Sequence, residues 1–195
     1  NIYKINNNIK VLESNQVIIV DGGSKDKTKK LLKQYCFISS SPSRGKQLHL
    51  GYKNSNEEWL LFLHADTILN KYNVLEIKKF IAENIYNKVA YFKLRFDNES
   101  FSANLISFWA NLRTKLFKLP FGDQCLLISN EYYQEIGGFS LIPIMEDIEL
   151  ILRIPKNNKY LFNSSIITSF KKYEENGVFK QCIKNIYRQI KFFLR

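Results

Sequence analysis

Apolar residues in the first part of the chain alternate between two spacings. Over residues 2–12 they recur as on one face of a helix, whereas residues 16–20 form a continuous run typical of a buried strand. The same alternation continues through a helix at 25–35, a strand at 36–39, a helix at 44–55 and a strand at 59–63. Strands that alternate with helices in this way predict an α/β fold with a mainly parallel sheet and right-handed crossovers.

The pattern changes after a helix expected at 72–87. Residues 89–96 alternate, with apolar side chains on one face and Lys93 and Arg95 on the other, which predicts a half-exposed strand. Beyond it, the sequence predicts a helix at 101–118, a segment at 121–129 that leads to a short helix, and a helix that begins near Met145. No internal repeat or long linker divides the chain, so residues 1–195 are expected to form a single domain.

The C-terminal segment, at about 176–195, is expected to form an amphipathic helix. Its apolar face carries Phe179, Ile183, Ile186 and Ile190, and its basic face carries Lys180, Lys184, Arg188 and Lys191. Two interpretations are open, because such a helix can lie in the headgroup layer of a membrane or pack its apolar stripe on the sheet. The helix at 101–118 has a similar mixture of residues and is a candidate for a second membrane contact.

The charge of the chain narrows its range of partners. Twenty-nine Lys and Arg against 18 Asp and Glu give a net charge of +11. Most of these cations are lysines scattered along the chain, so we do not expect a nucleic acid as the partner. The sequence contains no apolar run long enough for a transmembrane helix. Cys36, Cys125 and Cys182 lie far apart, which argues against a zinc site or disulfide framework and for a reducing compartment.

Two acidic turns follow predicted strands, and ligands of open α/β sheets bind beyond the carboxyl ends of strands. The first is Asp21-Gly22-Gly23-Ser24, where the glycines let a ligand approach the backbone and the carboxylate can accept from a ribose hydroxyl. The second is His64-Ala65-Asp66. A carboxylate such as that of Asp66 suits Mg²⁺ or Mn²⁺, which it can bridge to phosphate oxygens, although a lone acid here can also be a simple cap.

Three further segments place charge at turns and helix starts. Arg44-Gly45-Lys46-Gln47 begins a helix, where a guanidinium and free N–H groups suit a diphosphate. Glu146 and Asp147 begin another helix, and Asp123 lies in a turn. Each acid taken singly has a simple structural explanation, because it can stabilise a helix dipole or a turn without any catalytic role. The order of the segments along the chain is a more specific signal than any one of them.

That order resembles family 2 glycosyltransferases of GT-A fold. The resemblance covers about residues 2–190 and is nearest to the bacterial radical-SAM/selenodomain-associated glycosyltransferase-like group. The segments that carry it are Val20-Asp21-Gly22-Gly23-Ser24, Arg44-Gly45-Lys46-Gln47, Leu61-Phe62-Leu63-His64-Ala65-Asp66, Phe121-Gly122-Asp123-Gln124, Gly137-Gly138-Phe139 and Met145-Glu146-Asp147.

The resemblance implies a Rossmann-like nucleotide-diphospho-sugar transferase domain, with helices on a mixed, mainly parallel sheet. A nucleotide and metal half would cover about 1–70 and an acceptor half about 88–175. Asp66 would bind Mn²⁺ or Mg²⁺, and Asp147, with Glu146 beside it, would be the catalytic base. Asp123 and Gln124 would lie on the acceptor side. The donor-binding residues it implies are Asp21, Gly22, Gly23, Ser24, Arg44, Gly45, Gln47, His64 and Ala65.

The sequence also departs from the family pattern. His64 stands at the first acidic position of the metal motif, and Gly22 stands where a paired Asp is common. The QxxRW motif of processive polysaccharide synthases is absent near the C-terminus. The family's opening strand would precede residue 1, which predicts either a trimmed chain or a donor pocket that has lost some of its contacts.

These observations predict a metal-dependent inverting glycosyltransferase that uses a nucleotide-diphosphate sugar and an acceptor hydroxyl. The acceptor itself is open, and the family makes a lipid-linked acceptor one option. It would work in the cytoplasm, in peripheral contact with the inner face of a membrane. One alternative is a degenerate GT-A-like domain that binds an anionic membrane or partner without catalysis. The other is a nucleotidyltransferase, which also joins a parallel sheet to a metal carboxylate.

Overall fold

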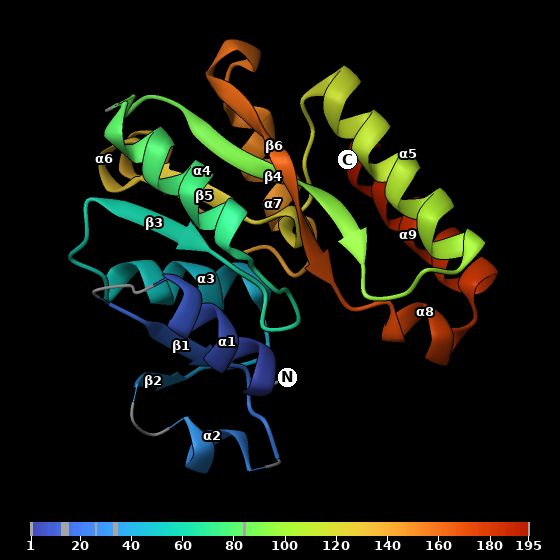
Figure 1. Cartoon of the computed structure of the whole chain (residues 1–195), viewed down its shortest axis with the longest axis horizontal. Helices are drawn as coiled ribbons and strands as arrows, with labels where there is room; N and C mark the ends of the chain where they lie inside the picture. Colours follow the sequence, from blue (N-terminus) through green and yellow to red (C-terminus); the bar gives the residue numbers. More distant parts are fainter. Residues whose placement is uncertain (1, 13–15, 26, 33–34, 84, 195) are drawn as a thin grey trace.

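The computed structural model describes residues 2–12, 16–25, 27–32, 35–83 and 85–194 (Figure 1). Its first part contains α1 (Ile2–Leu12), β1 (Ile18–Asp21), α2 (Thr28–Leu31), β2 (Cys36–Ser39) and α3 (Arg44–Lys53). The strands β1 and β2 pair in parallel, and α3 packs against β1. Because this sheet has only two strands, β1 is half-buried, which corrects the expectation of a fully buried strand. Parts of the helix predicted at 25–35, residues 26, 33 and 34, lie outside the described residues.

A second sheet forms the centre of the molecule. It contains β3 (Trp59–Phe62), β4 (Val89–Phe96), β5 (Leu126–Ser129) and β6 (Lys159–Thr168) in the order β3-β5-β4-β6. The strand β5 is antiparallel to β3 and β4, whereas β4 and β6 are parallel. The α/β fold with helices on mixed sheets is thus confirmed, with the strands divided between two sheets and β5 supplying the antiparallel pairs.

Helices cover both faces of the four-stranded sheet (Figure 1). Alternate residues of each strand point to opposite faces, so Leu126 and Ile128 of β5 enter one apolar cluster and Leu127 enters the other. The first cluster packs against α3, α6 (Asn130–Glu135) and α7 (Glu146–Arg153), and the second packs against α4 (Lys71–Ala82) and the end of α1. The short 3₁₀ helices are η1 (Gly122–Gln124) and η2 (Lys156–Asn158).

The strand β4 is more buried than its sequence predicts. The alternation over residues 89–96 predicts a half-exposed strand, yet Val89 through Phe92 are all buried, and of the two basic residues only Arg95 is exposed. The cause is its central position, because β5 and β6 flank it and both helical layers cover its faces. Tyr91 is buried as well, although it lies on the same face of the strand as Lys93 and Arg95, which the sequence predicts to be exposed.

The chain ends in a helical hairpin beside the long helix α5 (Phe101–Phe117). This hairpin consists of α8 (Lys171–Asn176) and α9 (Val178–Phe193), which contact each other. A third apolar cluster, centred on Leu94, Phe96 and Phe170, receives Ala110 from α5 and Val178 from α9. None of the helices in the described part of the chain is both long and apolar enough to cross a bilayer.

The approach of α3 to α7 gives a prediction about stability. A Cβ on Gly45 would lie 2.4 Å from the backbone oxygen of Ser140, so Gly45→Ala has to push α3 away from its support. We expect a loss of about 1–3 kcal/mol in the free energy of unfolding, measured by urea denaturation.

Gly51→Ala is the matched control in the same helix. A Cβ on Gly51 would lie 3.5 Å from Cγ2 of Val20, an ordinary contact, so this variant should gain up to about 1 kcal/mol from helix propensity. Equal effects of the two substitutions would contradict the explanation.

Candidate active site

A pocket opens where the carboxyl end of β3 meets α3, η1 and the start of α7. His64 and Asp147 line it together with the backbone of Gly122. The rest of its lining is largely apolar and includes Leu48, Phe62, Leu126, Phe139 and Ile151. A few polar groups in an apolar pocket are the usual composition of a ligand site, because the apolar walls exclude water while the polar groups orient the ligand.

Asp147 reaches this pocket through a close approach to Gly122. The Gly122 N–H donates to Oδ2 of Asp147 at 2.6 Å, and the Ile148 N–H donates to Oδ1 at 2.8 Å. A Cβ on Gly122 would lie 3.0 Å from both Oδ2 of Asp147 and Nε2 of His64. A side chain at this position would crowd both groups, and both oxygens of the Asp147 carboxylate are held by hydrogen bonds.

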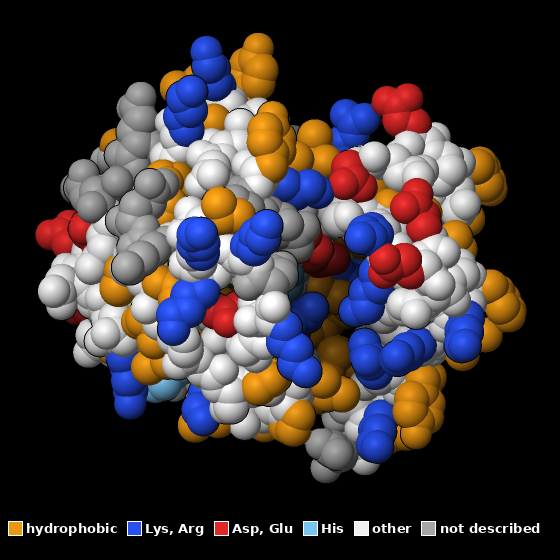
Figure 2. All heavy atoms as spheres, turned by 90° about the horizontal axis from the view of Figure 1, so that it is seen from below, with side chains coloured by type: hydrophobic (Ala, Val, Ile, Leu, Met, Phe, Trp, Pro, Cys, Tyr) orange, Lys and Arg blue, Asp and Glu red, His pale blue; other side chains and the backbone are white. Residues whose placement is uncertain are grey.

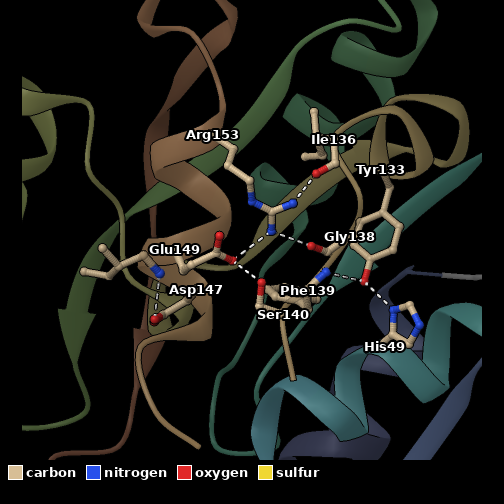
Figure 3. Close-up of polar contacts among 10 residues, drawn as sticks. His49, Tyr133, Ile136, Gly138, Phe139, Ser140, Asp147, Glu149 and Arg153 are labelled. Carbon is tan, nitrogen blue, oxygen red and sulfur yellow. Dashed lines mark hydrogen bonds and ion pairs between the residues drawn. The ribbon is translucent and has the colours of Figure 1, made fainter. Parts of the chain in front are cut away.

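The helix α7 is anchored behind the pocket by Arg153 (Figure 3). This guanidinium donates to the carbonyl oxygens of Ile136 and Gly138 and pairs with Glu149 at 2.9 Å. Ser140 donates to the same Glu149 carboxylate at 2.6 Å. The network ties the turn after α6 to α7 and so fixes the position of Asp147. The sequence interpretation did not include it, although Glu149 and Arg153 stand at the i,i+4 spacing of a helical ion pair.

The turn that carries Asp66 is held by α1. Lys4 Nζ donates to the Asp66 carbonyl oxygen at 3.1 Å, and Asn8 Nδ2 donates to the Thr67 carbonyl oxygen at 2.7 Å. The Leu69 N–H returns a bond to Oδ1 of Asn8 at 2.8 Å. Asn8 is buried and satisfied by these contacts, so a helix distant in sequence supports the candidate metal ligand.

The first acidic turn is stabilised by its own carboxylate. Asp21 Oδ2 accepts from the N–H groups of Gly23 and Ser24 at 3.0 and 2.8 Å, and Oδ1 accepts from the Ser24 hydroxyl at 2.5 Å. Gly23 has φ of 98°, a conformation that favours glycine. Gln47 donates to the Val20 carbonyl oxygen at 3.1 Å, so in this structure it supports the turn.

Two of the predicted site residues are buried in the protein interior. Gln124 is 0% exposed and donates to the Phe92 carbonyl oxygen at 2.8 Å, while its own oxygen accepts from Thr114. Glu146 is also buried, lies against Gly45, and has its carboxyl pKa raised by that burial. Neither side chain is among those that line the pocket, so any role of Gln124 toward the acceptor or of Glu146 in catalysis would depend on these buried positions.

Opposite charges gather around His64. Burial lowers the His64 pKa, Arg44 and Lys172 lower it further, and the carboxylates of Asp66 and Asp147 oppose them. A neutral imidazole therefore lies among two cations and two acids. The charges of Arg44, Asp66 and Asp147 come to His64 from separate segments, and Lys172 on α8 was not anticipated.

Asp123 carries the largest perturbation among the acids of this region. Burial raises its pKa to about 6, the charge of Arg113 opposes the rise, and Asp147 adds to it. Its Oδ1 is buried without a hydrogen-bond partner among the described residues. Arg113, a second residue that the sequence interpretation missed, lies 3.4 Å from the Phe121 ring centroid and donates to the Leu119 carbonyl oxygen at 3.2 Å.

The donor set at Asp66 fits a metal that takes most of its ligands from a substrate. Over the described ranges of the chain, no group of three or more His, Cys, Asp or Glu side chains is placed to hold an ion. Mg²⁺ and Mn²⁺ are often held by one or two carboxylates together with phosphate oxygens. Asp66 can supply such a carboxylate, whereas a structural zinc site would need more protein ligands than this site offers.

The sequence profile of the family described as "Glycosyl transferase family 2" matches residues 5–136, which is more than half of the chain. The chain belongs to this family. A comparison with curated protein sequences gave no significant match.

Solved structures of other proteins share the fold. TarS of S. aureus (residues 1–349) has a TM-score of 0.64 and 16% identity, over 86% of this chain and 56% of that one. Mannosyltransferase PcManGT from Pyrobaculum calidifontis, in complex with GDP-Man and Mn²⁺, has a TM-score of 0.63 and 14% identity, over 85% and 51%. Glucosyl-3-phosphoglycerate synthase from Mycobacterium tuberculosis, with Mn²⁺ and UDP-Glc, has a TM-score of 0.57 and 14% identity, over 86% and 65%. This family 2 chain thus spans about half to two thirds of their length.

The raised pKa of Asp123 predicts how stability depends on pH. The folded protein holds this proton up to about pH 6, whereas an unfolded Asp releases it near its usual pKa of 3.8. The free energy of unfolding should therefore fall as pH rises between these values. The Asp123→Asn variant has no carboxyl group to ionise here, so it does not lose stability in this way. Its free energy of unfolding should exceed that of wild type by an amount that grows across this pH range, to at most about 3 kcal/mol.

Asp97→Asn is the control of opposite sign. Burial tends to raise the Asp97 pKa, but hydrogen bonds from the Phe170 N–H and Lys4 outweigh it and lower the pKa. This variant should be less stable than the wild type at pH 7 and should approach it in acid, because protonation removes the wild-type advantage. Urea denaturation of the three proteins over a pH series measures both trends, and parallel pH curves for wild type and Asp123→Asn would contradict the assignment.

Proposed function

We propose that this chain is a metal-dependent inverting glycosyltransferase that moves a sugar from a nucleotide-diphosphate donor to an acceptor hydroxyl. The observation that carries the proposal is that Asp147, Gly122 and His64 meet in one pocket. His64 stands two positions before Asp66 in the chain, so the candidate metal ligand lies next to this pocket in sequence. The family supports it, as do GT-A neighbours that were crystallised with GDP-Man or UDP-Glc and Mn²⁺. Within the family, we propose the radical-SAM/selenodomain-associated group on the order of the sequence motifs.

The donor side would use the two turns and the start of α3. Asp66 would hold Mn²⁺ or Mg²⁺, and the bound ion would stabilise negative charge on the leaving diphosphate. Arg44, the first residue of α3, would offer its guanidinium and the helix N-terminus to the same phosphates. The turn from Asp21 to Ser24 would lie against the nucleoside.

The acceptor side would use Asp147. In a single displacement, the acceptor oxygen forms a bond to the anomeric carbon while the bond from that carbon to the diphosphate oxygen breaks. The electron pair leaves with the diphosphate, the hydroxyl proton passes to the Asp147 carboxylate, and the anomeric centre is inverted. Hydrogen bonds from Gly122 and Ile148 orient the carboxylate toward the pocket that it shares with His64.

The +11 charge supports a second candidate, a degenerate GT-A-like domain that binds an anionic membrane or partner without catalysis. The presence of Asp147 in the pocket, together with Asp66 two residues along the chain from pocket-lining His64, favours catalysis over this alternative and over a nucleotidyltransferase. We also place the protein in the cytoplasm, in peripheral contact with a membrane where a lipid-linked acceptor would be accessible. The free state of Cys36, Cys125 and Cys182 supports a reducing compartment.

Asp66→Asn tests the metal assignment. The amide keeps the shape of the side chain but loses the charge, so Mn²⁺-dependent binding of UDP or GDP should be lost. Isothermal titration of the two nucleotides, with and without Mn²⁺, measures the effect. If wild type binds neither nucleotide with or without Mn²⁺, the degenerate domain is favoured. If nucleotide binding by the variant still depends on Mn²⁺, Asp66 is not the metal ligand.

Asp147→Asn tests the base. Turnover should fall by about 10²–10⁴ while donor affinity stays within a few fold, because the amide cannot accept the proton. Release of nucleoside diphosphate from a panel of sugar donors and acceptors gives the rate. Glu149→Gln is the matched control on the same helix, since Glu149 faces Ser140 and Arg153 behind the pocket. If both variants lose turnover equally, the effect belongs to the position of α7 and not to a base.

A further inference from the structure

The helix α9 is oriented with its apolar face outward. Its buried and half-buried positions include polar Gln181, Asn185, Arg188 and Gln189. Its apolar stripe is 51 to 79% exposed and consists of Phe179, Ile183, Ile186, Tyr187, Ile190 and Phe193. The interpretation that this stripe packs on the sheet is therefore wrong for the described structure, because the stripe is exposed and the inward face holds these polar side chains together with Val178, Cys182 and Phe192.

This orientation is fixed by hydrogen bonds between α8 and α9. Asn185 Nδ2 donates to the Tyr173 hydroxyl at 3.0 Å, and Gln181 Nε2 donates to Oδ1 of Asn185 at 2.8 Å. Asn176 Nδ2 donates to Oε1 of Gln181 at 3.1 Å, and Gln181 is fully buried. Rotating α9 to bury its apolar stripe would break these bonds and take from the half-buried Tyr173 hydroxyl its hydrogen-bond donor, which is costly.

The helix α5 shows the same inversion. Its buried positions are Ala103, Ser107 and Thr114, and both hydroxyls bond back to carbonyl oxygens of the same helix. Besides Asn104 and Lys115, its exposed positions are large and apolar, between 43 and 82% exposed: Phe101, Leu105, Phe108, Trp109, Leu116 and Phe117. The two helices lie on the same side of the molecule, away from β1 and β2, and both contribute to the apolar cluster around Phe96 (Figure 1).

The charges on these helices are all positive. The exposed cations are Lys180, Lys184 and Lys191 of α9 and Lys115 of α5, and neither helix contains Asp or Glu. Arg188 of α9 and Arg113 of α5 are half-buried, and Arg113 is turned toward Phe121 and Leu119. In the part of the surface at the right of Figure 2, apolar patches alternate with Lys and Arg near the outer edge. Two acids of the neighbouring α8 are engaged, because Glu174 accepts from Asn98 and Glu175 pairs with Lys171.

We propose that the exposed faces of α5 and α9 form one docking surface for an anionic lipid bilayer. Apolar and aromatic side chains would enter the boundary between headgroups and acyl chains, and the flanking cations would contact anionic headgroups. Anionic lipids complement the charge of this surface. A second copy of the chain that docked through the same surface would bring like charges together, so we favour the bilayer as the partner. The docking surface goes beyond the proposed glycosyl transfer and does not depend on it.

Sedimentation with vesicles tests the proposal. Wild type should bind vesicles of phosphatidylcholine with phosphatidylglycerol at low salt, bind pure phosphatidylcholine at least tenfold more weakly, and be partly released by added salt. The double variant Ile186→Gln/Ile190→Gln should bind anionic vesicles at least tenfold more weakly. Both positions are exposed, so thermal unfolding of this variant should match that of wild type.

The matched control changes exposed apolar residues on a different helix. Tyr72 and Leu75 of α4 are 74 and 63% exposed, and Tyr72→Gln/Leu75→Gln should bind vesicles as wild type does. Asp66→Asn should also bind as wild type does, which separates docking from the proposed catalysis. Anionic vesicles should shift the fluorescence emission of exposed Trp109 to the blue, and Trp109→Phe should remove this shift.

Three results would overturn the proposal. The first is equal or negligible binding of wild type to neutral and anionic vesicles at low salt. The second is equal loss of binding in the α4 and α9 variants. The third is a dimer in analytical ultracentrifugation that the α9 variant converts to a monomer, without any vesicle binding, which would assign the surface to a second copy of the chain.

Discussion

The close approach at Gly122 sets the arrangement of the whole site. The N–H of this residue bonds the carboxylate of Asp147, and the missing side chain leaves the space in which Asp147 and His64 come together. Every element around the pocket is placed to permit this contact. The helix α7 is tied to the preceding turn by Arg153, and Gly45 lets α3 come close to Ser140 and Glu146. Two glycines on different elements, Gly45 and Gly122, therefore lie where an added side chain would crowd the groups around the pocket.

Local patterns predicted most of the elements but not their neighbours. The apolar runs at β1 and β3 and the helix spacing of α3 and α4 are visible in the sequence, because they depend on residues close in the chain. The insertion of β5 between β3 and β4 is not visible, since the choice of a strand's neighbour depends on contacts across the sheet. For the same reason the sequence predicted β4 to be half-exposed, whereas its central position buries Tyr91.

The candidate site shows the same division between local and distant information. Motifs identified Asp66 and Asp147, because the order of short acidic segments along the chain is specific to a family. Burial could not be read from those motifs, so Gln124 was expected to face a substrate and the pKa rise of Asp123 was not expected. Arg113 and Lys172 were missed because each lies on a helix with another cation, Lys115 or Lys171, and only the fold shows which of the two turns toward the acids.

The two sides of α9 should respond differently to the solution around them. Its inner side is joined to α8 by amides and the Tyr173 hydroxyl, and burial raises the Tyr173 pKa to about 12, so the group stays neutral near physiological pH. Dissolved ions screen exposed charges but have little effect on neutral hydrogen bonds. Ionic strength can therefore weaken contacts made by the outer lysines while the helix stays attached to the domain. One helix thus combines a permanent attachment with an outer face whose contacts are reversible.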